Sequence, residues 1–103
     1  MVALDLDHNY RPHVTQRQYL IVVSCREDRE PVQKYLRDHG LSPVEADEAW
    51  VLTATSERGR LNDGLYLTVW TTKAKLDLQM MLTGHGWDVQ VIADREAKMY
   101  HGR

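Results

Sequence analysis

The chain has 103 residues, a length that excludes a two-domain protein. Of these residues 43% are hydrophobic and 27% are charged, a composition that excludes a largely disordered chain. Its 13 Lys and Arg residues against 15 Asp and Glu residues give a formal net charge of -2. A large basic excess that would drive nucleic-acid binding is therefore excluded, and we expect no nucleic-acid partner.

Cysteine content and hydropathy indicate the compartment. Cys25 is the only cysteine, so the chain can form neither an internal disulfide nor a cysteine-based zinc site. No window holds the roughly 20 apolar residues of a membrane span. Asp5 and Asp7 interrupt the stretch where a signal peptide has its apolar core. We expect a cytoplasmic protein that does not enter a membrane.

The apolar run Tyr19–Cys25 predicts a central strand, because apolar side chains on successive positions are typical of a strand covered on both faces. Residues 1–17 before it form an N-terminal extension, and the alternation within residues 2–7 could add an edge strand. After the strand, Pro31 fits the first turn of a helix, and Gly40 can end that helix in the left-handed conformation.

Two further strands are predicted, over residues 49–55 and 64–71, joined by a polar hairpin loop over residues 56–63. A second helix follows, ending near Thr83, and then a fourth strand over residues 87–93. Residues 94–103 are expected to form a C-terminal tail or a short helix.

This order of elements predicts an α+β fold of the ferredoxin-like split βαβ kind (βαββαβ), a single domain spanning residues 18–93. It has a four-stranded antiparallel sheet in the order 4-1-3-2 with two helices on one face. The segments 36–41 and 82–87 share the frame Leu-x-x-His-Gly-apolar, which supports two similar halves.

The predicted topology brings a group of basic side chains to one end of the sheet, beside the N-terminus of the first helix, where a small anion could bind. These anion-binding candidates are Arg26, Arg29, Arg58, Arg60 and His85. The alternative is that neighbouring acidic residues, such as Glu27 and Glu57, neutralise the arginines as exposed ion pairs.

The sheet face opposite the two helices is the second candidate site, because aromatic and β-branched side chains with few charges are typical of an interface. The interface candidates are Val51, Thr53, Tyr66, Thr68, Trp70, Gln90 and Ile92. A homodimer could bury this face. Alternatively, the terminal segments could fold over it.

Residues 63–70 resemble the third-strand motif of the RNA-recognition motif in Gly64 and Trp70, a family that stacks bases on sheet aromatics. They depart from it at Asp63, which replaces a basic residue, and at Leu65 and Leu67, which replace the stacking aromatics. We therefore do not infer RNA binding for this chain from the resemblance.

The segment Trp70–Thr72, opening a helix that ends near His85, is similar to part of the small dimeric α/β-barrel monooxygenases. This resemblance implies an oxygenase as an alternative function. The helical histidine of that family is missing, with Gln79 and Met80 in its region. The asparagine that some haem-degrading members use on the first strand is missing too, since residues 19–25 hold none.

We find no catalytic triad, metal set or phosphate loop, and we expect no cofactor. The residues Asp5, Asp7, His8 and His13 could ligate a metal, but a solvated tail explains them more simply. The sequence favours a small non-catalytic binding module that contacts a protein partner or a second copy of itself through the open sheet face. A small-anion-binding regulatory module is the alternative.

Overall fold

The computed structural model describes residues 16–57, 59, 61 and 63–97. Four strands form one antiparallel sheet in the order β2-β3-β1-β4. The strands are β1 (Gln16–Val23), β2 (Val44–Glu45), β3 (Leu65–Thr71) and β4 (Val89–Ala97). The helices are α2 (Arg29–Asp38), α3 (Glu48–Ala54) and α4 (Lys75–Thr83), and a 3₁₀ turn, η1 (Arg26–Asp28), precedes α2. The predicted α+β class and four-stranded antiparallel sheet are confirmed.

Strand β1 lies inside the sheet, between β3 and β4, and its residues from Tyr19 to Val23 are all buried. Because side chains alternate along a strand, Tyr19, Ile21 and Val23 enter the core beneath α2 and α4, whereas Leu20 and Val22 enter a second core on the opposite face. The prediction that this stretch is an interior strand is confirmed.

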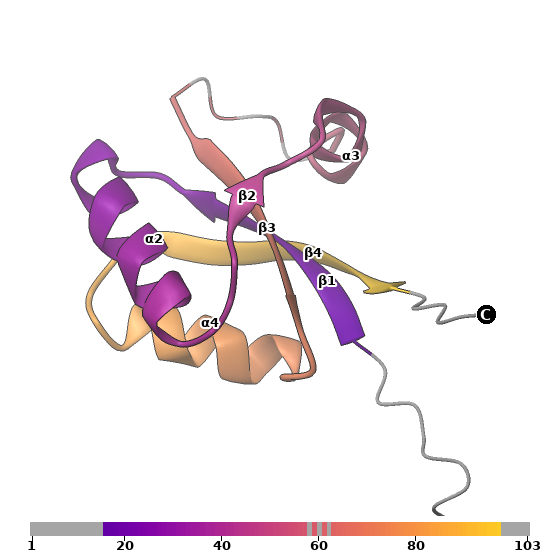
Figure 1. The fold of residues 1–103 in the computed structure, drawn as a ribbon. Helices are drawn as coiled ribbons and strands as arrows, with labels where there is room; N and C mark the ends of the chain where they lie inside the picture. Colours follow the sequence, from indigo (N-terminus) through magenta and orange to yellow (C-terminus); the bar gives the residue numbers. More distant parts are fainter. Residues whose placement is uncertain (1–15, 58, 60, 62, 98–103) are drawn as a thin grey trace, which may run out of the picture.

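Helices α2 and α4 cover one face of the sheet (Figure 1). Their buried residues are Val32 and Leu36 from α2 and Leu78 and Leu82 from α4. Gly40 ends α2 as predicted, with a φ of 81°. The N–H of buried Leu41 bonds to the carbonyl of Leu36 at 2.9 Å, which closes the helix in a Schellman arrangement.

The predicted second strand, residues 49–55, is wrong, because this segment forms helix α3. The Asp47 carboxylate caps the helix by accepting the Ala49 N–H at 3.3 Å. Val51 is 1% exposed and packs into the second core. Helix α3 thus lies on the sheet face opposite α2 and α4 (Figure 1). The second strand is instead β2, two residues that pair with Thr68 and Leu67.

Strand β4 contains an irregularity that changes which face its last residues occupy. Leu20 pairs with Ala93 and Ile21 pairs with Val91, so Ile92 is an extra residue on β4. Beyond the bulge, Arg95 lies opposite Gln18.

The chain ends differ in part from the predictions. β4 continues to Ala97, so a tail or helix is wrong for residues 94–97, which pair with β1 instead. The expected N-terminal edge strand and the residues after Ala97 lie outside the described residues. No helix in the described part of the chain has the length and apolarity needed to cross a membrane.

Candidate functional site

Helix α3 covers only part of its sheet face and leaves a group of side chains in reach of a partner. Trp70, Gln18 and Arg95 lie opposite one another on β3, β1 and β4. Trp70 is 42% exposed, and Val44 on the neighbouring strand β2 is 54% exposed. We call the group Gln18, Val44, Trp50, Trp70 and Arg95 the open strip.

Two contacts hold Arg95 in the open strip. Its Nε donates a hydrogen bond to Oε1 of Gln18 at 2.7 Å, and its guanidinium carbon lies 3.9 Å from the ring centroid of Trp50. Such stacking leaves other guanidinium N–H groups able to bind an acceptor. No carboxylate of the described residues forms a salt bridge with Arg95. The strip therefore presents an oriented cation stacked on Trp50, with the exposed ring of Trp70 two strands away on the same face.

The structure buries some of the predicted interface residues and leaves others exposed. Tyr66, Thr68 and Ile92 are buried, and Val51 is buried as part of the helix that covers the face. Trp70 remains exposed, as do Thr53 on α3 and Gln90 on β4. Sheet-to-sheet packing over the whole face is therefore blocked by α3.

Sequence reasoning missed four members of the strip, which are Gln18, Val44, Trp50 and Arg95. Trp50 was assigned to a strand, and the position of Arg95 depends on a bulge that no turn or glycine signal marks. The alternation along the central strand was the one available signal, since it puts Gln18 on the same face as Leu20 and Val22.

The predicted anion-binding residues are only partly brought together. Exposed Arg26 lies 3.9 Å from the carboxylate of Asp63, and Arg29 donates a hydrogen bond to the carbonyl of Asp63. Arg58 and Arg60 lie outside the described residues. His85 stacks on Trp87, with ring centroids 4.5 Å apart. His85 also makes an edge contact with a tyrosine of α2, Tyr35.

The loop after β1 and the loop before β4 meet at this end of the sheet, and their contact involves acidic groups. The Asp88 N–H, just before β4, donates to Oδ2 of Asp28 at 2.9 Å. Cys25 lies beside them, exposed, and donates a weak hydrogen bond to Asp88 at 3.9 Å. Desolvation, followed by the negative charges of Asp28, Asp88 and Glu27, raises the pKa of the Cys25 thiol. The raised pKa favours the neutral thiol, which is a poorer nucleophile than the thiolate.

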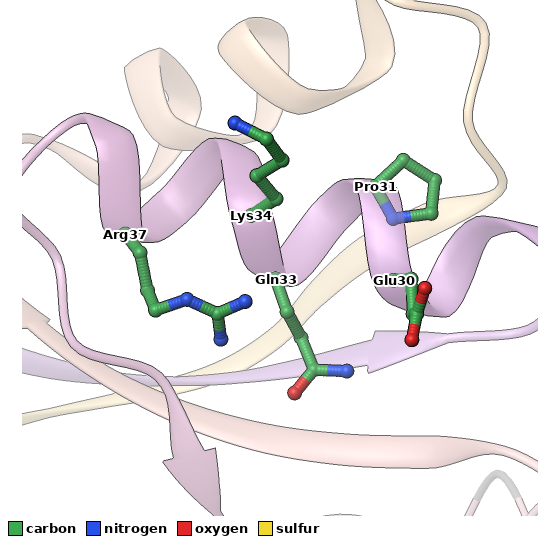
Figure 2. A pocket seen from close by; sticks show the side chains of 5 residues that line it. All are labelled: Glu30, Pro31, Gln33, Lys34 and Arg37. Atoms are coloured by element: carbon green, nitrogen blue, oxygen red, sulfur yellow. The ribbon is translucent and has the colours of Figure 1, made fainter.

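A hollow of about 480 Å³ lies on the outer side of α2, and Figure 2 shows its five lining side chains. They are Glu30, Pro31, Gln33, Lys34 and Arg37. All come from this one helix and project in different directions (Figure 2). Lys34 is also paired with Asp38 at 2.9 Å. Ligand sites have polar groups that converge on a common point, and this hollow lacks them.

Gln79 occupies the region of α4 where the monooxygenase resemblance requires a histidine, and its side chain bonds to the backbone of β4. Among the described residues, no group of three or more His, Cys, Asp or Glu side chains could hold a metal ion. The residues considered as metal ligands from the sequence, between Asp5 and His13, lie outside that part of the chain.

No protein-family model, curated protein or solved structure matches the chain.

Proposed function

We propose that this chain is a non-catalytic binding module that contacts another protein through the open strip, and that its fold is ferredoxin-like. The observation that carries the functional proposal is Arg95, held between Gln18 and Trp50 on the same sheet face as the exposed ring of Trp70. Tryptophan and arginine are enriched among the residues that dominate binding energy at protein interfaces. An arginine that is already oriented loses less conformational entropy on binding.

The strand order and the position of α2 and α4 on one face support the ferredoxin-like assignment. Helix α3 is the departure, since it replaces most of the second strand of that fold. We assign the protein to the cytoplasm because its single cysteine, Cys25, suits a reducing compartment.

A second copy of the chain is the first partner to test. Light scattering after size-exclusion chromatography would compare the wild type with Trp70→Ala and Arg95→Gln over a wide concentration range. If a homodimer forms through the open strip, each substitution weakens it by roughly tenfold or more, as expected for a binding-energy hot spot. The control is Leu76→Ala, which removes an exposed leucine from α4 on the opposite side of the sheet and leaves the dimer intact.

A monomeric wild type would exclude the second copy and leave a different protein as the partner. A photo-crosslinking amino acid at position 70 is then expected to capture that partner from cell extract, whereas the same group at position 76 is not. Equal capture at the two positions would contradict the proposal.

The second candidate function is binding of a small anion at the N-terminus of α2, and one observation favours it. Nε of Arg29 is buried and has no hydrogen-bond partner among the described residues. Inorganic phosphate at about 100 times its dissociation constant would stabilise the fold by about 2.7 kcal/mol. We expect phosphate to raise the melting temperature of the wild type and not that of Arg29→Gln, as measured by differential scanning fluorimetry. The same rise in both proteins, or in neither, contradicts anion binding at Arg29.

A further inference from the structure

No strand among the described residues pairs with the outer edge of β4, and a side chain covers part of that edge. β4 pairs with β1 on its inner side and has nine residues. The Oε1 atom of Gln79 accepts the Val91 N–H at 2.7 Å, and Nε2 of Gln79 donates to the Val89 carbonyl at 2.9 Å. One side-chain amide thus makes the two hydrogen bonds that an added strand would make there.

The surroundings of Gln79 hold it in this position. Its neighbour Leu78 is fully buried in the core under α4, as is Leu82 one turn later, so the helix is fixed against the sheet. Further along the same strand, the extra residue Ile92 disturbs the regular spacing that a second strand needs. Unprotected edge strands pair with other copies of a chain, and natural proteins block them with such devices.

We propose that the Gln79 side chain closes the β4 edge and thereby prevents a second copy of the chain from pairing with it, β4 against β4. The amide occupies the N–H of Val91 and the carbonyl of Val89, so an incoming strand must displace it. This role is independent of the open strip, which lies on a face of the sheet and not at this edge.

The experiment uses the full chain carrying Trp70→Ala, so that association through the open strip does not contribute. In this background Gln79→Ala is compared with Gln33→Ala, whose glutamine bonds only to the Arg29 carbonyl within its own helix. At concentrations where Gln79→Ala is still monomeric, we expect hydrogen exchange of its Val91 amide to be roughly tenfold faster or more, because that amide loses its acceptor. We also expect concentration-dependent association in analytical ultracentrifugation. Gln33→Ala is expected to show neither effect.

A second variant, Gln79→Glu, tests the same contact without shortening the side chain. When protonated, the Glu carboxyl can donate to the Val89 carbonyl and accept from Val91, as the amide does. When ionised, it faces that carbonyl with no donor. The ionised side chain keeps the Val91 N–H bond and loses the bond to the Val89 carbonyl, so the free energy of unfolding should fall relative to the Gln79 parent as the carboxyl ionises and recover on acidification. Unchanged Val91 exchange in monomeric Gln79→Ala, or a Gln79→Ala variant that does not associate at any concentration, would overturn the proposal.

Discussion

Replacing Val51 with aspartate is expected to destabilise the protein by about 3–5 kcal/mol, the cost of leaving an unpaired charge in a buried site. Val51 is 1% exposed and packs in the second core, which consists of Leu20, Val22, Val51, Tyr66 and Ile92. A carboxylate at position 51 finds no cation in that cluster, so α3 must leave the sheet or the whole domain must unfold. Urea denaturation followed by circular dichroism measures the loss.

The next residue provides the control. Leu52 lies on the same helix and is 56% exposed, so Leu52→Asp is expected to change the free energy of unfolding by only about 0.5 kcal/mol in either direction. Equal losses for the two variants would mean that α3 does not rest on the sheet through Val51. The pair separates the packing of α3 from the helix propensity of aspartate, which both variants share.

The sequence was sufficient for the elements that carry an unambiguous periodicity. Tyr19–Val23 has no helical stripe of polar residues, and its composition is typical of a buried strand. The first helix is framed by Pro31 and Gly40, two residues whose backbone preferences agree with the positions they occupy. In these elements, local preference and tertiary packing favour the same structure.

Helix α3 could not be predicted in the same way, because its residues fit both periods. Trp50, Val51 and Ala54 lie on one side of a helix, yet Trp50 and Ala54 also share one face of a strand. The Val and Thr residues favour a strand, whereas Asp47 before Glu48 is a helix start signal. The segment forms a helix because this conformation buries Val51 against an apolar sheet face, which residues far away in the sequence form.

The same limit applies to the candidate sites. The bulge at Ile92 aligns Arg95 with Gln18, and only the pairing of two strands reveals it. Gln79 has no sequence signal for its role either, since an exposed helical glutamine and one that bonds to a strand edge look alike in a sequence. Trp70 alone was named from the sequence and is exposed in the open strip.

Tyr19→Ala is the second substitution with a large expected effect, a loss of about 3–5 kcal/mol, as for other aromatic residues removed from a core. Tyr19 is 0% exposed, lies on the central strand and packs in the core under α2 and α4. Its hydroxyl donates a hydrogen bond to the Lys73 carbonyl at 2.5 Å, in the connection between β3 and α4. The truncation therefore leaves a cavity and also removes the hydrogen bond that Tyr19 makes to that connection. Chemical denaturation measures the loss.

Tyr19→Phe separates the hydroxyl from the ring and supplies a pH dependence. It keeps the ring, so we expect a loss of only about 1 kcal/mol near neutral pH, the net worth of one hydrogen bond. Burial, and then the negative charge of Asp94, raise the pKa of the Tyr19 phenol above its usual 10.0. The folded state therefore favours the protonated phenol, and this contribution is fully present below pH 10 and is lost as the pH rises through the folded-state pKa. Comparing unfolding free energies of the two proteins up to that range isolates Tyr19, because every other titrating group is common to both. The wild type should lose its advantage over Tyr19→Phe as the solution becomes alkaline, and a difference that stays constant with pH would contradict a buried, hydrogen-bonded phenol at the centre of the sheet.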